Sequence, residues 1–168
     1  MKQKKINYIL ISLLFCLNNL YGQVNHKVTF TNDYSVESVK FPDGIIYSHI
    51  KVSGMSSIDS LGFPTLPIKY INLLVSANST VTGVIINELQ KHLTILDYKL
   101  TPGQYPKKTG LDDQPKGFVK PDGVKYNSDA PYPSDYIKIV DQNLFRGNRI
   151  VTLAVYPFRY YPAKNELE

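Results

Sequence analysis

The sequence of 168 residues is poor in cysteine and tryptophan. It contains one cysteine, Cys16, and no tryptophan, against 13 tyrosines and 11 prolines. Cys16 lies in an N-terminal segment that we expect to be removed, so the remaining chain has no thiol. This excludes disulfides, zinc–thiolate sites and a cysteine nucleophile within the mature polypeptide. A chain of this size with 43% hydrophobic residues can bury a core without such cross-links.

A long hydrophobic run is also missing. The apolar stretch from Tyr8 to Leu17 spans ten residues, about half of what a membrane-crossing helix needs. Three lysines precede it, and Gly22 supplies a small residue just before the expected cleavage point. These features are typical of a secretory signal peptide. We therefore expect a signal peptide over residues 1–22 and a single exported domain over residues 23–168.

A lipid anchor on Cys16 is the alternative interpretation of this segment. The two residues before it, Leu14 and Phe15, are bulky, whereas small residues usually precede a lipidated cysteine. An uncleaved N-terminal anchor is the other alternative. The downstream cleavage site favours removal of the whole segment over both.

Charge of one sign does not accumulate anywhere. The formal net charge is +5, and removal of Lys2, Lys4 and Lys5 with the signal peptide lowers it to +2. The remaining charges are scattered, without a basic run or a basic helix face. Neither a nucleic acid nor, after signal cleavage, a membrane is therefore expected as a partner.

Catalytic and metal-binding motifs are absent as well. His26, His49 and His92 are widely spaced, and none belongs to a His-Glu-x-x-His pattern. The sequence has no Gly-x-Ser-x-Gly elbow, no phosphate-binding loop and no dinucleotide fingerprint. The chain is therefore expected not to be an enzyme itself and to need no metal or cofactor.

Short apolar or alternating segments recur between turn signals, while capped segments of helical periodicity are missing. This pattern predicts an all-β domain, a single sandwich or barrel-like structure of about seven short strands. The last strand is apolar on both faces, which is typical of a central position. Tight turns are expected at Pro42-Asp43-Gly44 and at Arg146-Gly147-Asn148. The expected strands cover residues 27–31, 46–52, 68–75, 81–87, 93–99, 136–140 and 149–158.

Residues 101–135 are an exception to this pattern. Six of the 11 prolines fall between Pro102 and Pro133, together with several glycines and lysines. Loops longer than about 15 residues are uncommon in compact domains and are generally functional or disordered. A Pro-Asp-Gly sequence at residues 121–123 predicts a turn within this loop.

One cluster, Gly62-Phe63-Pro64-Thr65-Leu66-Pro67, stands directly before a predicted strand. Gly62 permits a bend, and both prolines fix φ and lack an N–H donor. Pro67 therefore suits the first residue of a strand, and Leu66 can fill the core. On physical grounds alone, the cluster is a rigid start to a strand.

In order and spacing, these features resemble the N-terminal propeptide of gingipain-type secreted cysteine peptidases. The resemblance spans about residues 43–162, with Tyr161 standing where that family more often has Asn. It is carried by Asp43, Gly44, Gly54, Gly62, Pro64, Leu66, Pro67, Leu100, Thr101, Pro102, Gly103, Tyr132, Pro133, Arg146, Gly147, Ala154, Tyr156, Pro157, Tyr160 and Pro162.

The resemblance implies a secreted, periplasmic or surface-located bacterial prodomain. Such a prodomain assists the folding of a cysteine peptidase catalytic domain and keeps it latent by occluding its active-site cleft. The partner is then that catalytic domain, in cis in full-length members or in trans if this chain stands alone. The catalytic Cys and His of the family belong to that domain, so no catalytic role falls on any residue here.

The resemblance also bears on the basic loop and on the end of the chain. Lys107 and Lys108 lie closest to the family's basic processing site, and Lys116, Lys120 and Lys125 are later candidates for an inhibitory or processing residue. Each is also open to the simpler interpretation of a solvated loop charge. The family pattern continues into another strand beyond residues 163–168, so the last strand is expected to be missing. Its loss would leave the predicted strand 149–158 with an unpaired edge.

A different class of function is a secreted surface β-sandwich module that binds glycan or protein. Its binding residues would be exposed tyrosines such as Tyr47, Tyr126, Tyr132 and Tyr160. Aromatic side chains carry much of the burial in small β domains, so core packing is the competing role for each of them.

Overall fold

The computed structural model describes residues 26–28, 34–58, 60–87, 89, 91–106 and 117–168. The chain divides into two units, Met1–Phe30 and Thr31–Glu168. Only residues 26–28 of the first unit are described, so the architecture below is that of the second. In this part the strands are β1 (Tyr34–Lys40), β2 (Ile46–Val52), β3 (Ser56–Ser57), β4 (Pro67–Ser76), β5 (Thr94–Ile95), β6 (Ile137–Phe145), β7 (Asn148–Val155), β8 (Tyr160–Tyr161) and β9 (Glu166–Leu167), with one short helix, α2 (Gly123–Tyr126). The predicted all-β class is confirmed.

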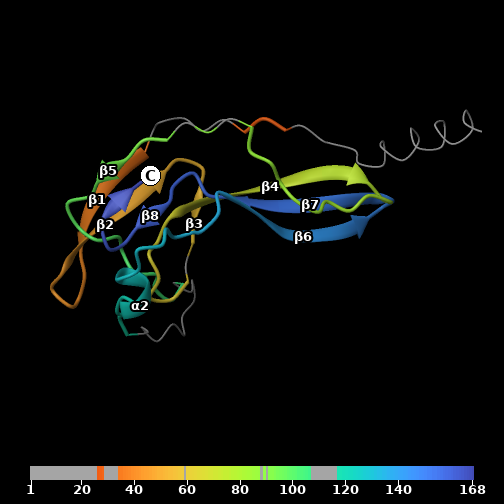
Figure 1. Ribbon diagram of the computed structural model, residues 1–168. Coiled ribbons are helices and arrows are strands. Elements are labelled where there is room, and N and C mark those ends of the chain that lie inside the picture. The colour runs from red at the N-terminus through yellow and green to blue at the C-terminus, as the bar shows by residue number, and fades with distance from the viewer. Residues whose placement is uncertain (1–25, 29–33, 59, 88, 90, 107–116) are drawn as a thin grey trace, which may run out of the picture. The chain divides into compact units, whose positions relative to one another are not determined.

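These strands form three sheets (Figure 1). β1 pairs with β2, the order β3-β4-β7-β6 makes a four-stranded sheet, and β5-β9-β8 makes a three-stranded one. All pairings between these strands are antiparallel. Among the described residues, no helix is long and apolar enough to cross a membrane.

The β1–β2 hairpin contains the predicted turn. Gly44 has φ +81°, and the Asp43 carboxylate accepts a hydrogen bond of 3.0 Å from the Ile45 N–H. The strand expected at residues 27–31 lies partly outside the described residues, and residues 27 and 28 are not in a strand. The partner of β2 is instead β1, whose side chains are mostly exposed and give no regular hydrophobic pattern.

β7 is central, as predicted. It pairs with β4 along one edge and with β6 along the other. The expectation of an unpaired edge for this strand is therefore wrong, because β6 extends to Phe145 and supplies the second ladder. The predicted reversal before β7 is confirmed, since Arg146 and Gly147 both adopt positive φ.

The strand expected at residues 81–87 is wrong. That segment has no strand, and Ile85 is 76% exposed. The side-chain amide of Gln142 in β6 accepts from the Val81 N–H at 3.0 Å and donates to the Val81 carbonyl at 2.9 Å. At Val81, hydrogen bonds to a side chain thus take the place of main-chain pairing with a neighbouring strand. Of the strand expected at residues 93–99, only β5 forms.

A central cluster of buried side chains joins segments that are far apart in the sequence. Tyr160, Leu100 and Leu66 are fully buried, and Ile50, Leu96 and Leu167 complete the cluster. Leu66 therefore fills the core as expected, and Pro67 is the first residue of β4. The cluster lies beside the point where the long loop leaves and rejoins the fold.

Candidate functional site

The candidate site is the base of the long basic loop. Lys107, Lys108 and Lys116 lie outside the described residues, whereas Lys120 and Lys125 are described and exposed. Two stems lie before and after residues 107–116, which are outside the described residues. The incoming stem comprises residues 99–104, and the outgoing stem comprises residues 117–122.

The incoming stem extends the β1–β2 sheet. The main-chain N–H of Ser48 in β2 donates to the Lys99 carbonyl at 2.8 Å, and the Ser48 carbonyl accepts from the Thr101 N–H at 2.9 Å. The two segments are parallel at this point. On its other side, the Thr65 N–H donates to the Thr101 carbonyl at 2.8 Å. Leu100 points into the core and is fully buried. Main-chain hydrogen bonds on both edges and the buried Leu100 side chain thus hold the incoming stem in place.

Gly62 contacts both stems through its main chain. Its N–H donates to the Gly103 carbonyl at 2.9 Å, and its carbonyl accepts from the Asp122 N–H at 2.8 Å. Its φ is +75°, and an added Cβ would lie 3.0 Å from the Lys120 carbonyl oxygen. Only glycine fits both conditions without strain. The rigid start to β4 therefore also holds the base of the loop.

Gln104 makes a second connection between the stems. Its Nε2 donates to the carbonyls of Pro102 at 3.0 Å and Val119 at 2.8 Å, and its Oε1 accepts from the Val119 N–H at 2.9 Å. Gln104 and Val119 are 15 residues apart in the sequence. We call the set Gly62, Gly103, Gln104, Val119 and Asp122 the stem clasp.

The outgoing stem runs into α2. The predicted Pro-Asp-Gly turn is an N-cap, because the Asp122 carboxylate accepts from the Val124 and Lys125 N–H groups at 2.9 Å each. A helix of four residues is not stable alone. α2 is held by Tyr126, which is buried and donates to the Leu100 carbonyl at 2.8 Å.

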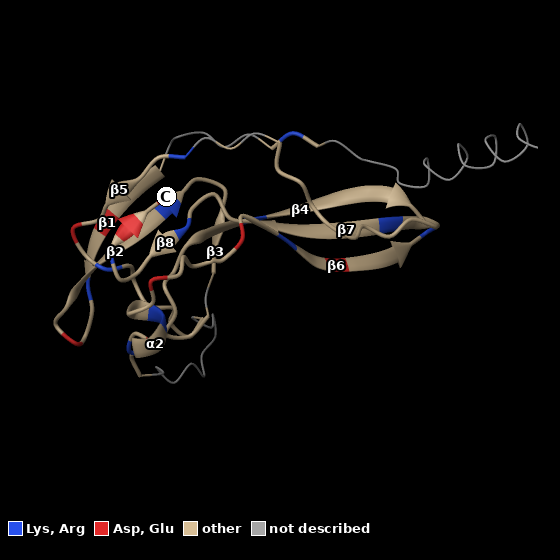
Figure 2. Ribbon diagram, viewed as in Figure 1, with Lys and Arg blue, Asp and Glu red and all other residues tan. Residues whose placement is uncertain are grey.

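The two described candidate lysines differ in their surroundings. The Lys125 ammonium group lies 5.1 Å from the centroid of the Phe63 ring. This is a cation–π contact with the cluster that precedes β4. Lys120 is exposed on the outgoing stem, next to the clasp. Figure 2 shows basic positions in and beside α2. Among these two, Lys120 is the more available to a partner.

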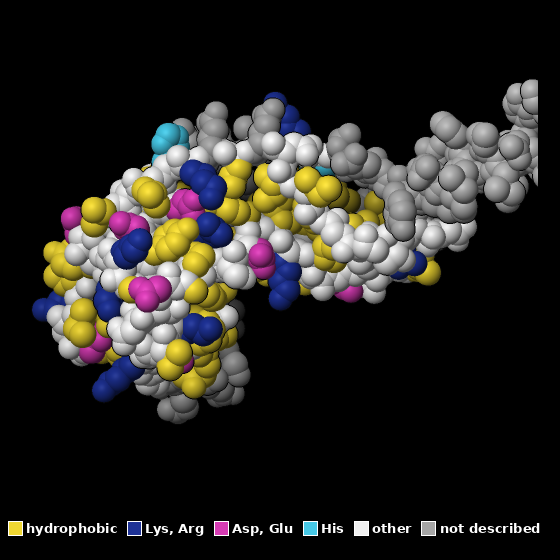
Figure 3. Space-filling view, viewed as in Figure 1, with side chains coloured by type: hydrophobic (Ala, Val, Ile, Leu, Met, Phe, Trp, Pro, Cys, Tyr) yellow, Lys and Arg dark blue, Asp and Glu magenta, His cyan; other side chains and the backbone are white. Residues whose placement is uncertain are grey.

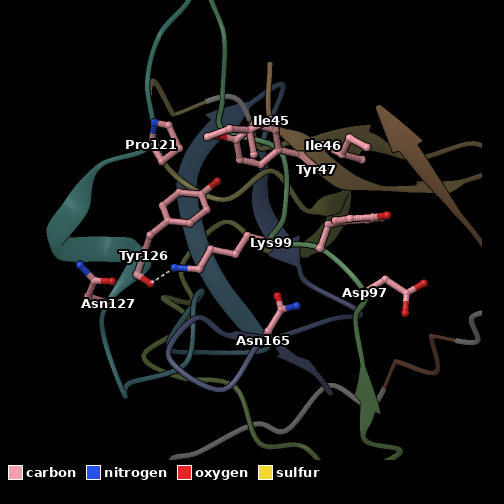
Figure 4. A pocket seen from close by; sticks show the side chains of 10 residues that line it. Ile45, Ile46, Tyr47, Asp97, Lys99, Pro121, Tyr126, Asn127 and Asn165 are labelled. Atoms are coloured by element: carbon pink, nitrogen blue, oxygen red, sulfur yellow. Dashed lines mark hydrogen bonds between the residues drawn. The ribbon is translucent and has the colours of Figure 1, made fainter. Parts of the chain in front are cut away.

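A hollow of about 530 Å³ lies next to the outgoing stem (Figure 4). Tyr47, Lys99 and Tyr126 line it, and the Lys99 ammonium group donates to the Tyr126 carbonyl at 3.4 Å. Burial and the nearby Asp43 carboxylate raise the pKa of Tyr47 to about 12, so its phenol is neutral. The residues that line the hollow include no His, Cys or Ser. Nor do the described residues contain a group of three side chains that could hold a metal ion.

Glu168, directly after β9, lies in a cluster of charged and polar side chains. Lys91 contacts one Glu168 carboxylate oxygen at 2.9 Å, and Arg159 and Tyr161 contact the other at 2.8 and 2.9 Å. Burial raises the pKa of Glu168, but these hydrogen bonds outweigh it and lower that pKa to about 2. On the face shown in Figure 3, charges of both signs are interspersed among apolar side chains.

A profile of the family described as Propeptide_C25 matches residues 16–168. The chain belongs to this propeptide family. A search of the curated proteins finds no match. The resemblance to gingipain propeptides is confirmed, and the chain is the propeptide part of a peptidase precursor.

The fold agrees with two solved structures from Porphyromonas gingivalis. The first, a complex of the RgpB pro- and mature domains, matches with a TM-score of 0.67 and 20% identity over 80% of this chain and 68% of that chain. The second, a structure on the zymogenic latency of gingipain K, matches with a TM-score of 0.60 and 18% identity over 80% of this chain and 73% of that chain. The propeptide therefore has a gingipain-prodomain-like all-β fold.

The family-motif residues have structural positions in this propeptide. Pro64 and Leu66 are fully buried beside the incoming stem, and Pro162 is fully buried after β8. Gly62 joins the stems, and Arg146 and Gly147 form the β6–β7 turn. No sequence pattern pointed to Gln104 or Val119, because their contact is a side-chain hydrogen bond between segments 15 residues apart.

The alternative module was expected to bind through exposed tyrosines, and that expectation is wrong. Tyr47 and Tyr126 are each 3% exposed, and Tyr160 is fully buried. Tyr132 is half-buried, with its ring centroid 5.8 Å from that of Phe63. These rings are part of the core, because their apolar area is large and their hydroxyl groups find partners inside the fold.

Proposed function

We propose that this propeptide is exported after removal of residues 1–22 and binds the catalytic domain of a gingipain-type cysteine peptidase. It assists the folding of that domain and keeps it latent by occluding the active-site cleft with its basic loop. The partner is bound in cis in a full-length precursor or in trans if the chain acts alone. The observation that carries the proposal is the stem clasp, which fastens both ends of the basic loop to a rigid β scaffold.

The physical basis is preorganisation. A loop with fixed ends loses less conformational freedom on binding than a free segment, so more of the contact energy remains as affinity. A basic side chain on such a loop can enter a pocket with complementary charge, while the surrounding surface excludes water. The candidates for this side chain are Lys107, Lys108, Lys116, Lys120 and Lys125.

The test is inhibition of a gingipain-type catalytic domain by purified residues 23–168. The mature domains of RgpB and gingipain K are the first targets, with hydrolysis of a short basic peptide substrate as the readout. We expect inhibition at micromolar or lower concentration. No change in rate with any such domain at that concentration would contradict the proposal.

The inhibitory residue is found by single substitutions of the five lysines by alanine. If one of them occupies the pocket, its variant should inhibit at least about tenfold more weakly, because a buried charged contact is lost. Lys138→Ala, which changes an exposed lysine in β6, is the matched control. Equal inhibition by all six variants would remove the lysines from this role.

A further inference from the structure

In the four-stranded sheet, β4 and β6 lie on either side of β7, and each has an outer edge that faces away from it (Figure 1). On the β4 edge, β3 pairs with Pro67 and Ile68. From Tyr70 to Val75, no strand in the described part of the chain pairs with this edge. An edge of this kind presents a row of outward main-chain N–H and C=O groups to another strand.

The β6 edge has features that keep further strands away. Lys138 and Asp141 place charges of both signs along it. The pairing of β6 with β7 also shifts in register between Ile139 and Asp141, as at a β-bulge. Charged side chains and bulges are the usual means by which proteins prevent an exposed edge from pairing with another chain. The β6 edge is therefore unsuited to an added strand.

The β4 edge has none of these features. The segment Tyr70–Ser76 contains no charged residue and no proline, and its pairing with β7 is continuous in register. Tyr70 and Leu74 share one face of the sheet and are 57% and 68% exposed. A regular, uncharged and apolar edge of this length is an aggregation hazard unless a partner covers it. The contrast between the two edges of one sheet indicates that the β4 edge has a partner.

We infer that the β4 edge from Tyr70 to Val75 binds an extended, uncharged segment of the peptidase catalytic domain as an added strand. The inference rests on the proposed function, because that function supplies the partner. It adds a second contact surface, on a sheet that does not include the stem clasp. Main-chain hydrogen bonds to the added strand provide affinity, and Tyr70 and Leu74 contact its alternate side chains.

The size and the charge of the edge favour this partner over a second copy of the propeptide. Six residues of strand are about 20 Å long. Two paired β4 edges alone would bury far less than the roughly 1,600 Å² of a standard interface between separate molecules. A catalytic domain that is also bound at the basic loop, or joined in the same chain, can use a small contact because its effective concentration is high. The partner segment is uncharged, because a charge placed here would lose water without gaining an ion pair.

The first measurement is hydrogen exchange by NMR in residues 23–168, alone and bound to the mature domain of RgpB or gingipain K. Between Tyr70 and Val75, the alternate amides that face away from β7 should exchange rapidly in the free propeptide. In the complex they should exchange at least about tenfold more slowly, while the outward amides of β6 stay unchanged. Rapid exchange at these β4 amides in the complex would overturn the inference.

The free propeptide also tests the other occupants of the edge. If the outward β4 amides are already protected without peptidase and lose this protection on dilution, a second copy covers the edge. If they stay protected on dilution, another part of the chain covers it. Either result would overturn the inference.

The second measurement is inhibition by Leu74→Glu, with Leu144→Glu as the matched control. Both side chains are exposed leucines in the same sheet, at 68% and 62%, but Leu144 lies in β6. A charge at residue 74 should prevent strand addition, so Leu74→Glu should inhibit at least about tenfold more weakly. Leu144→Glu should inhibit within about twofold of the wild type. Wild-type inhibition by Leu74→Glu, or an equal loss in both variants, would overturn the inference.

These results separate the inference from the proposed function. If the wild type inhibits no gingipain-type domain, both fail. If it inhibits while the outward β4 amides still exchange rapidly in the complex, only the inference fails. Circular dichroism checks that both variants fold, and the exchange of the wild type decides the matter if Leu74→Glu does not.

Discussion

At the scale of single residues, the same backbone conformation has different consequences at different glycines. Gly54 and Gly62 have nearly the same positive φ, at +73° and +75°. An added Cβ at Gly54 meets nothing within 4 Å, whereas at Gly62 it would lie 3.0 Å from the Lys120 carbonyl oxygen. Gly62 is therefore required for its conformation and for the close approach of the outgoing stem.

Gly62→Ala should lower the free energy of unfolding by about 2–3 kcal/mol, because strain from the left-handed conformation adds to the displacement of the stem. Gly54→Ala, the control, should lose only about 1–2 kcal/mol from the strain. Urea denaturation followed by circular dichroism measures both. Equal losses in the two variants would contradict a role for close packing at Gly62.

The lowered pKa of Glu168 predicts a contribution to the free energy of unfolding that is lost in acid. Its pKa is lowered from 4.5 to about 2 in the folded protein, so the unfolded chain takes up its proton first as the pH falls. The contribution is complete above about pH 4.5 and is lost as the pH falls towards 2. Glu168→Gln should cost about 1–2 kcal/mol at pH 7, a modest value because the lysine partner is exposed to solvent. The variant should also lose stability less steeply than the wild type below pH 4.5.

The control for Glu168 is Glu37→Gln. Glu37 pairs with Lys51 at 2.7 Å, but both side chains are about half exposed, so the change should cost well under 1 kcal/mol. Denaturation curves at pH 7, 4.5 and 2.5 compare the two variants with the wild type. A wild-type slope retained in Glu168→Gln would contradict the assignment to this carboxyl.

At the scale of elements, the segment 81–87 shows where local pattern and tertiary contact disagree. Its run of valine and isoleucine favours a strand, but a strand needs a neighbouring edge for its ladder. Gln142, 61 residues away, takes both main-chain groups of Val81 through its side chain. β6, which carries Gln142, lies at the edge of its sheet, yet it forms no ladder with residues 81–87. Hydrophobic periodicity contains no information about either fact.

Gln142→Ala should therefore release this segment. We expect a loss of about 1–2 kcal/mol in unfolding free energy and faster hydrogen exchange at the Val81 amide, because two hydrogen bonds to a half-buried carboxamide are lost. Lys138→Ala, at an exposed position in the same strand, should leave exchange at Val81 unchanged. Retained protection at Val81 in Gln142→Ala would contradict this account of the segment.

At the scale of the whole molecule, the parts of the chain before and after the long loop are interleaved. β4 precedes the loop and pairs with β7, which follows it, and β5 pairs in the same way with β9. The central cluster combines Leu66 and Leu100 from one part with Tyr160 and Leu167 from the other. Cleavage within the loop breaks one covalent bond and none of these contacts.

A nicked propeptide should therefore stay assembled. With a site for a specific protease inserted between Lys108 and Thr109, the two fragments should elute together in native size-exclusion chromatography and separate in denaturant. The matched control carries the same insertion but is left uncut, and its elution volume should be the same. Separation of the fragments under native conditions would contradict the prediction.

The amino-acid sequence alone determined the features that depend on local sterics. The turn at Gly44, the reversal at Gly147, the start of β4 at Pro67 and the buried position of Leu66 follow from the allowed φ values of glycine and proline and from adjacent hydrophobicity. The order of these features was also enough to indicate the propeptide family. Such constraints act over a few residues, so they can be read directly from neighbouring positions.

Only the tertiary structure decided which distant groups meet. The contact of Gln104 with Val119, the capture of Val81 by Gln142 and the burial of Tyr47, Tyr126 and Tyr160 all depend on segments brought together by folding. A glutamine in a loop has the same local pattern whether its amide faces water or two carbonyls. The two cases differ in whether the amide group has lost its water. That loss takes place only when the folded chain surrounds the amide, so neighbouring residues in the sequence do not reveal it.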